Sequence, residues 1–325
     1  MIISKTPFRV SFLGGGTDLK SFYKDYSGSV ISTSIDKYMY ITLHDYFHPS
    51  NFLLKYSKTE IVNSIEKIEH PIIREVFKYF DIKSIDFNST ADIPAGTGMG
   101  SSSAFTNGLI NACSELKGDK LTPHEIAKLA CHIEIDILNE PIGKQDQYGT
   151  AIGGFKRIRF NEDESVDITP ISLNEKKLAK LQDNLLLFHT NQTRPASSIL
   201  TEQKHNTSSS QKVINNLKSM HSLVDQLFND LNNQNIDTFG NYLHQTWLYK
   251  KELATNVSNN FIDDLYETAM LNGAEGGKLL GAGASGFLLL YAPIEKHKAL
   301  RKALSICREL SFNFEKEGTG IIFSK

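Results

Sequence analysis

The sequence predicts an α+β fold, and three features indicate that class. Segments typical of strands and segments with helical periodicity both occur, but they do not alternate strictly as they would in a doubly wound sheet. The chain has 325 residues, about twice a domain of ~150 residues, which predicts one large domain or two closely packed ones. Hydrophobic residues make up 40% of the chain and charged residues 22%, a balance typical of a globular protein rather than of a disordered one.

The charge balance and the apolar pattern exclude several classes of protein. Lys and Arg number 35 and Asp and Glu 37, for a formal net charge of -2, so no nucleic acid or anionic membrane is expected as a partner. The apolar run at 286–293 is far shorter than the ~18 residues of a membrane span, and no signal-peptide pattern is found. The cysteines, Cys113, Cys131 and Cys307, lack metal-type spacing. We expect a soluble cytoplasmic protein.

Residue type and periodicity place the strands and helices. Runs rich in β-branched and aromatic residues predict strands at 2–12, 30–35, 38–43, 85–90, 155–160, 184–190, 278–280, 287–291 and 311–314. Apolar residues at helical spacing predict helices at 72–80, 104–116, 122–137, most of 195–271 and 295–308. The polar segment 161–181 is the expected domain junction, which divides the chain into 1–180 and 181–325.

The helix that begins after Thr122 has the clearest start signal. Thr122 can cap it, Pro123 suits its first position, and Glu125 completes a capping box. Glu134 lies roughly 80° from the centre of the apolar stripe of this helix when each residue advances about 100°. From this border position the carboxylate can reach a neighbouring cleft, although a solvated glutamate fits the same pattern.

A glycine-rich stretch at 94–104 is the strongest single feature. Glycines let the backbone approach a polyanion closely, and the free N–H groups at a helix start favour phosphate. The stretch lacks the Lys of a Walker A loop and the third glycine of a dinucleotide fingerprint. A phosphate-binding loop and an ordinary glycine loop capped by serine are both open from the spacing alone.

A second glycine-rich stretch, at 281–286, matches G-x-G-x-x-G in sequence but not in context. The apolar segment 287–291 follows it in place of a helix, and no acidic residue lies at the expected distance. We therefore expect a tight loop between two strands, packed against a bulky neighbour, rather than a dinucleotide site.

Two charged residues fit both a structural and a functional role. Asp146 lies in the polar turn Gly-Lys-Gln-Asp-Gln-Tyr and can cap a helix start. Arg9 lies in a strand-like run, where a charge is unusual unless it is paired or belongs to a site. The histidines are scattered and predict no metal cluster.

In combination these segments resemble the GHMP kinases, the superfamily of galactokinase, homoserine kinase, mevalonate kinase and phosphomevalonate kinase. Segment 7–18, Pro-Phe-Arg-Val-Ser-Phe-Leu-Gly-Gly-Gly-Thr-Asp, is similar to the first family motif. Segment 94–104 is similar to the second motif, the phosphate loop, and 278–286 to the third. The three motifs occur in the family order and cover both ends of the chain.

Within the superfamily, the chain most resembles the D-glycero-D-manno-heptose 7-phosphate kinases. The likeness rests on Phe-Leu-Gly-Gly-Gly-Thr-Asp-Leu in the first motif, on segment 143–148 and on segment 189–200. Galactokinases have an acid and a histidine where this chain has Gly15 and Gly16. One departure is that Ala284 and Ser285 interrupt the glycines usual in the third motif of this subfamily.

The resemblance implies a fold, cofactors and binding residues. The fold would be an N-terminal domain of ribosomal-protein-S5 type and a C-terminal ferredoxin-like domain, with the active site between them. ATP and Mg²⁺ would be the cofactors. The residues implied for ATP are Pro94, Gly96, Gly98, Met99, Gly100, Ser101, Ser102 and Ser103. The residues implied for the substrate are Gly15, Gly16, Thr17, Asp18, Arg194 and Gly283.

The resemblance also implies catalytic and metal roles. Asp146 matches the family's catalytic aspartate, which would deprotonate the acceptor hydroxyl. Arg9 would stabilise the transferring group or hold Asp146 ionised. Ser102 and Glu134 would ligate Mg²⁺, which prefers a few hard oxygen ligands together with phosphates.

The implied reaction moves the γ-phosphoryl of ATP to the anomeric hydroxyl of a heptose 7-phosphate, for nucleotide-activated heptose synthesis. Asp18 would hold sugar hydroxyls, and Arg194 would bind the 7-phosphate unless it forms a surface ion pair. Two alternatives are open, namely another GHMP kinase such as a fucose-type sugar 1-kinase, and a non-catalytic sugar sensor on the same fold. ATP and a sugar phosphate are the expected partners, and a homodimer is left open.

Overall fold

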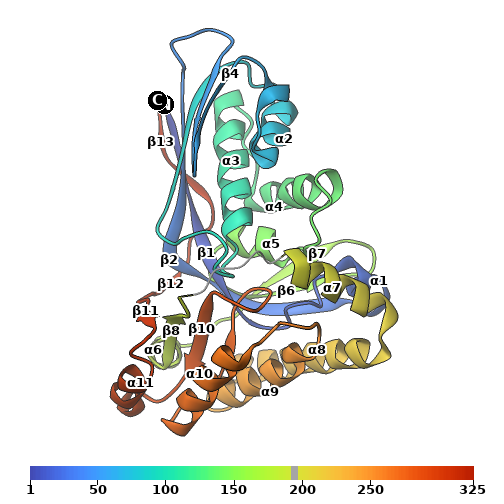
Figure 1. Ribbon diagram of the computed structural model, residues 1–325, viewed down its shortest axis with the longest axis vertical. Coiled ribbons are helices and arrows are strands. Elements are labelled where there is room, and N and C mark those ends of the chain that lie inside the picture. The colour runs from blue at the N-terminus through green and yellow to red at the C-terminus, as the bar shows by residue number, and fades with distance from the viewer. Residues whose placement is uncertain (192–196) are drawn as a thin grey trace.

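Two β-sheets with helices packed on them make up the computed structural model of this chain, which describes residues 1–191 and 197–325 (Figure 1). Strands and helices do not alternate strictly along the chain, so the expected α+β class is confirmed. No helix in the described ranges combines the length and the apolar character needed to span a lipid bilayer.

The larger sheet is built around a long hairpin of β1 (Ile2–Leu13) and β2 (Gly28–His44). Its order is β13-β1-β2-β5-β3-β4, with β12 and β6 also paired to β2, and β7 paired to β6. The other strands are β3 (Phe52–Lys55), β4 (Thr59–Val62), β5 (Ile85–Ala91), β6 (Phe155–Phe160), β7 (Val166–Pro170), β12 (Phe314–Glu315) and β13 (Gly320–Ser324). The two strands expected at 30–35 and 38–43 are one, because β2 stays paired with β1 across a register shift.

One face of the larger sheet is covered by α3, which lies along β1 and β2 (Figure 1). The helices of this part are α1 (Lys20–Tyr26), η1 (Ile65–Lys67), α2 (Pro71–Tyr79), α3 (Ser101–Lys117), α4 (Pro123–Cys131), η2 (His132–Ile137) and α5 (Gln145–Ala151). Helix α4 starts as predicted, with Thr122 and Glu125 forming a reciprocal capping box. It continues into η2, a π-helical turn that the sequence pattern does not predict.

The smaller sheet has the order β11-β8-β10-β9, and all its neighbouring strands are antiparallel. Its strands are β8 (Leu185–His189), β9 (Gly276–Leu279), β10 (Phe287–Tyr291) and β11 (Arg308–Glu309). The accompanying helices are α6 (Glu175–Asp183), α7 (Ser197–Ser209), α8 (Gln211–Asn232), α9 (Phe239–Lys251), α10 (Asn260–Leu271), η3 (Ile294–Lys296) and α11 (His297–Ala303). The helix expected at 295–308 is shorter, because Arg308 already pairs with β8.

The chain returns to the larger sheet at its C-terminal end. Strand β13 pairs with β1, and the amino group of Met1 donates to the carbonyl of Lys325 at 2.6 Å. Segment 161–181, the expected junction, contains β7 and most of α6 rather than a linker. The division near residue 180 stays a prediction, but the larger sheet takes strands from both sides of it.

An aromatic cluster joins the two parts of the molecule. The ring of Phe12 in β1 packs edge-on against the rings of Phe155 and Phe239, with 5.8 Å and 5.2 Å between ring centroids. The centroid of the Phe314 ring lies 6.2 Å from that of Phe12. Phe239 begins α9, which packs on the smaller sheet, whereas the other three rings belong to the larger one. This shared core fixes β1 against α9 and β9, and the site described next lies beside it.

Candidate active site

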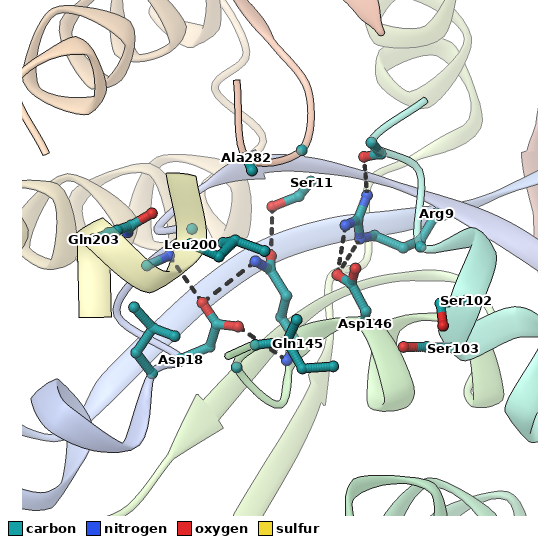
Figure 2. A pocket seen from close by; sticks show the side chains of 18 of the residues that line it. Arg9, Ser11, Asp18, Ser102, Ser103, Gln145, Asp146, Leu200, Gln203 and Ala282 are labelled. Carbon is teal, nitrogen blue, oxygen red and sulfur yellow. Dashed lines mark hydrogen bonds and ion pairs between the residues drawn. The ribbon is translucent and has the colours of Figure 1, made fainter. Parts of the chain in front are cut away.

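A cleft with a volume of about 230 Å³ lies where β1, the start of α3, α5, α7 and the loop after β9 meet (Figure 2). Most of the predicted site residues line it, namely Arg9, Gly15, Gly16, Asp18, Gly96, Gly98, Gly100, Ser101, Ser102, Ser103 and Asp146. The structure therefore brings together segments that are far apart in the sequence. The binding and catalytic roles of these residues stay predictions.

The other predicted residues do not line this cleft. Pro94, Met99, Thr17, Glu134 and Gly283 are absent from its wall within the described part of the chain. Thr17 supports the turn from behind, because its hydroxyl donates to the carbonyl of Gly14 at 2.7 Å. Arg194 lies outside the described residues.

Arg9 and Asp146 form an ion pair at one end of the cleft. Nε and Nη2 of Arg9 both donate to Oδ1 of Asp146, with Nε 2.9 Å away. Nη1 of Arg9 donates to the carbonyl of Gly98 at 2.8 Å. Arg9 is 2% exposed, whereas the side chain of Asp146 is 30% exposed. Asp146 lies in the first turn of α5. The N-cap residue of this helix is Lys144, whose side chain makes no capping hydrogen bond. The side chain of Asp146 pairs with Arg9.

Asp18 is held by Gln145, the residue next to Asp146. Oδ1 of Asp18 accepts from the N–H of Gly16 at 2.8 Å and from Nε2 of Gln145 at 3.3 Å. Oδ2 accepts from the backbone N–H of Gln145 at 3.2 Å. Oε1 of Gln145 accepts from the hydroxyl of Ser11 at 2.9 Å. Burial, and then the charge of Asp146, raise the pKa of Asp18 to about 6.

The two glycine-rich loops touch each other through their backbones. Gly98 and Gly281 have left-handed φ angles of 80° and 72°. A Cβ on Gly98 would lie 2.7 Å from backbone atoms of Leu280 and Gly281, so no larger residue fits there without movement. The loop at 281–286 is thus the expected tight loop between two strands, and at Gly281 it packs against the backbone of Gly98.

Ala284 adopts a left-handed backbone in the third motif. This residue has a left-handed φ of 63°, a conformation that favours glycine, and its N–H donates to the carbonyl of Val257 at 3.0 Å. Gly283 packs on the same residue, because a Cβ there would lie 2.5 Å from the carbonyl oxygen of Val257. The alanine therefore takes up the left-handed backbone where the subfamily pattern has glycine.

Glu134 lies just behind the phosphate loop, in the π-helical turn η2. It is 1% exposed and accepts hydrogen bonds from Ser102 at 3.1 Å, Ser103 at 2.9 Å, Thr106 at 2.8 Å and Nε2 of Gln147 at 2.5 Å. Burial raises the pKa of Glu134 above its usual value, although the four donors oppose the shift. The carboxylate thus contacts two serines of the cleft wall.

Eleven residues of the cleft wall are not among the predicted site residues, namely Ser11, Leu19, Ile142, Gly143, Gln145, Leu200, Gln203, Lys250, Lys278, Gly281 and Ala282. Lys278 stands in a short apolar strand, so the argument used for Arg9 would have found it. Lys250 is followed by Lys251 in the same helix, and no sequence signal separates the two lysines. Gln203 and Leu200 belong to α7 and enter the wall through the packing of that helix (Figure 2).

Comparison with known proteins agrees with this arrangement. The family model for the GHMP kinases N terminal domain matches residues 56–154. The D-glycero-α-D-manno-heptose 7-phosphate kinase of Campylobacter jejuni is 32% identical, over 98% of this chain and 97% of the relative. A D-glycero-D-manno-heptose 1-phosphate kinase structure from Bacteroides thetaiotaomicron superposes with a TM-score of 0.81 at 23% identity, covering 100% of both chains. The structure of Lactococcus lactis galactokinase complexed with galactose superposes with a TM-score of 0.76 at 16% identity, covering 98% of this chain and 94% of that chain. These two structures establish the fold alone.

The fold, the three loops around one cleft and the full-length relative define a phosphotransferase class. The chain belongs to the GHMP kinases, as the resemblance of its motifs predicts. It is an ATP-dependent phosphotransferase that uses an alcohol group as acceptor.

Proposed function

We propose that this kinase transfers the γ-phosphoryl group of ATP to the anomeric hydroxyl of D-glycero-D-manno-heptose 7-phosphate. The product would be the 1,7-bisphosphate, an intermediate for nucleotide-activated heptose. The observation that carries this proposal is the 32% identity, over 98% of the chain, to a relative named for a heptose 7-phosphate.

Asp146 acts as the general base in this proposal. Arg9 holds its Oδ1, while Oδ2 takes no part in that ion pair and can accept the proton of the sugar hydroxyl. A new P–O bond forms at the sugar oxygen as the bond to ADP breaks, and the electron pair leaves with ADP. Such a loose transition state needs positioning and charge neutralisation more than covalent chemistry. Arg9 serves both needs, since it also binds the carbonyl of Gly98 in the phosphate loop.

Ser102 and Glu134 would hold Mg²⁺. Oγ of Ser102, which lines the cleft, lies 3.1 Å from Oε1 of Glu134, whose carboxylate is buried directly behind the phosphate loop. Within the described residues no group of three or more His, Cys, Asp or Glu could hold a metal, which fits an ion that takes its other ligands from phosphates and water. When bound, the ion neutralises charge on the phosphate oxygens.

The sugar would lie toward Asp18. Its carboxylate is aimed at the end of the cleft that Leu200 and Gln203 close from α7 (Figure 2), and it can accept hydrogen bonds from sugar hydroxyls. Arg194, which we propose for the 7-phosphate, precedes α7 in the sequence by three positions. An arginine is suited to that role because its planar donors match a phosphate in a bidentate way.

The test is ADP release from MgATP in the presence of a panel of acceptors. Heptose 7-phosphate should give the highest kcat/KM, above the unphosphorylated heptose, fucose and galactose. Preference for fucose would instead support the fucose-type kinase, and no release with any acceptor would support the sensor. Asp146→Asn is the control for catalysis, since loss of a general base should lower kcat by ~10² or more while MgATP still binds.

A further inference from the structure

Two buried lysines line the cleft without a carboxylate partner among the described residues. Lys250 lies in the last turn of α9 and is 7% exposed, and Lys278 lies in β9 and is 3% exposed. Lysines are rarely buried this deeply unless they are paired. No carboxylate lies within 4.0 Å of either ammonium in the described part of the chain.

Both ammonium groups donate hydrogen bonds to backbone carbonyls, and Nζ of Lys250 also lies 5.9 Å from the centroid of the Trp247 ring. Nζ of Lys250 donates to the carbonyls of Leu279 at 2.8 Å and Gly281 at 2.5 Å. Nζ of Lys278 donates to the carbonyl of Phe12 at 3.0 Å. An ammonium has three N–H donors, so Lys250 keeps one donor and Lys278 two that no described acceptor takes up.

Arg9 completes a group of three buried cations around the same end of the cleft. Burial, and then the positive charge of Arg9, lower the pKa of Lys278 to about 7. Burial, then Lys278 and Arg9, lower the pKa of Lys250 well below its usual value. Among the described residues, Asp146 forms an ion pair with Arg9 and with neither lysine. The two lysines therefore lack the negative charge that would stabilise their ammonium forms.

Backbone contacts place Lys250 at the reacting end of the cleft. It holds Gly281, whose backbone touches Gly98, and Gly98 in turn accepts from Arg9. The charge of Arg9 affects the pKa of Lys278 more than the charge of Asp18 does. We propose that Lys250 and Lys278 are catalytic residues that bind non-bridging oxygens of the phosphoryl group in transfer.

In this step the lysines neither give nor take a proton. The sugar oxygen forms the new bond to phosphorus, its proton passes to Asp146, and the bond to the ADP oxygen breaks with its electron pair. The ammonium groups bind the charge that spreads over the transferring oxygens. The inference rests on the cleft being the phosphotransfer site and does not depend on which sugar is the acceptor.

The test is calorimetric binding of MgATP and of MgADP to the full chain without any sugar. Lys278→Met and Lys250→Met should each weaken MgATP by ~10-fold or more and leave MgADP almost unchanged, because only ATP carries the group that the lysines bind. With an acceptor present, kcat should fall by ~10²-fold or more. Lys278→Gln, which keeps a donor without the charge, should behave like the Met variant and serves if that variant does not fold.

Lys156→Met is the matched control. Lys156 is 1% exposed and also binds carbonyls, those of Gly149 at 3.2 Å and Gly154 at 3.1 Å, but it does not line the cleft. Its variant should keep the wild-type preference for MgATP over MgADP. Equal losses for both nucleotides in the cleft variants would overturn the proposal, since the lysines would then only hold the loop. A loss confined to the KM of phosphorylated sugars would also overturn it.

Discussion

Five charged side chains in the cleft wall or directly behind it are unusually buried. Arg9, Asp18, Glu134, Lys250 and Lys278 are each less than 9% exposed. Removing a charge from water is unfavourable, so such groups persist where ion pairs, hydrogen bonds or a ligand offset the loss. Their concentration in and behind one cleft is a physical argument for a functional site that is independent of sequence similarity.

The ionisation of Asp18 and Lys278 predicts a narrow pH profile. Burial raises the pKa of Asp18 to about 6, so below that pH the carboxyl gains a proton and loses its capacity to accept from sugar hydroxyls. Burial and Arg9 lower the pKa of Lys278 to about 7, so above that pH the lysine loses the charge that binds phosphate. We expect kcat/KM for the sugar to fall below about pH 6 and kcat/KM for ATP to fall above about pH 7, since kcat/KM reports the free enzyme.

The charged groups around Lys278 are Arg9, Lys250 and Asp18. Lys278→Arg tests the alkaline side, because a guanidinium stays protonated throughout this range. Its ATP profile should lose the decline above about pH 7. A decline at the same pH in that variant would assign the titration to another group, of which Lys250 is the nearest candidate.

Glu134→Gln should raise the Mg²⁺ concentration needed for half-maximal activity by ~10-fold or more, because the ion would lose its one carboxylate ligand. The measurement is a Mg²⁺ titration at fixed ATP. Thr106→Val is the matched control. Thr106 is buried outside the cleft wall, and its hydroxyl donates to the carboxylate of Glu134 at 2.8 Å, so the variant removes one hydrogen bond to that carboxylate and leaves its charge. Overlapping titrations of Glu134→Gln and wild type would place the metal elsewhere.

Among the elements, the two glycine-rich loops depend on close backbone approach. Gly96 and Gly98 have almost the same left-handed backbone, with φ angles of 75° and 80°. A Cβ on Gly96 would meet nothing within 4 Å, whereas one on Gly98 would meet the backbone of the opposite loop at 2.7 Å. The pair therefore separates backbone strain from steric exclusion between the loops.

Gly96→Ala should lower the free energy of unfolding by about 1 kcal/mol, the cost of a left-handed alanine. Gly98→Ala should lower it by about 1–3 kcal/mol more, because the added methyl group overpacks the contact between loops. Denaturant unfolding of both variants makes the comparison. Equal losses in the two variants would mean that the loops separate easily and that their contact contributes little.

The π-helical turn η2 explains why the position of Glu134 in the structure differs from the position that the helical wheel predicts. The wheel placed it on the border of an apolar stripe, with a solvated side chain as the alternative. In the structure the wider turn departs from the α-helical spacing, and the carboxylate is buried against α3. Glu134 does not line the cleft, and its carboxylate contacts Ser102 and Ser103 of the cleft wall from behind.

On the scale of the whole molecule, the C-terminal strand β13 forms one edge of the larger sheet. Residues Ile2, Ile3, Ser4 and Lys5 of β1 pair with β13, and the hydroxyls of Thr6 and Thr319 lie 2.7 Å apart. Strand β1 also carries Arg9 and Ser11 into the cleft. The C-terminal segment therefore stabilises the strand that positions the site, although none of its residues lines the cleft.

A chain that ends at Glu317 should unfold more easily than the full chain. It loses four cross-strand pairs between β1 and β13, each contributing about 0.2–1 kcal/mol, so a loss of about 1–4 kcal/mol is expected. Thermal unfolding and kinase activity are the measurements, and both should fall. Removal of Lys325 alone is the control and should change little. Unchanged stability of the shorter chain would show that β13 is dispensable for holding β1.

Local signals in the sequence determined much of this protein. Thr122 and Glu125 fixed the start of α4, and the glycines of 94–104 fixed the left-handed turns before α3. The charge of Arg9 within a strand required a partner, which Asp146 provides. Each of these signals depends on a few neighbouring residues or on the cost of burying one charge, so it can be recognised without knowing the rest of the fold.

Only the tertiary structure decided which distant segments meet. The return of β13 to β1 and the placement of Lys250 in the cleft wall depend on contacts between parts of the chain separated by most of its length. The β-branched residues of β7 in segment 161–181 are typical of a strand, but only the tertiary structure shows that the edge of β6 is its partner. The physical reason is that burial and strand pairing are properties of the assembled core, and local sequence does not encode which partner supplies them.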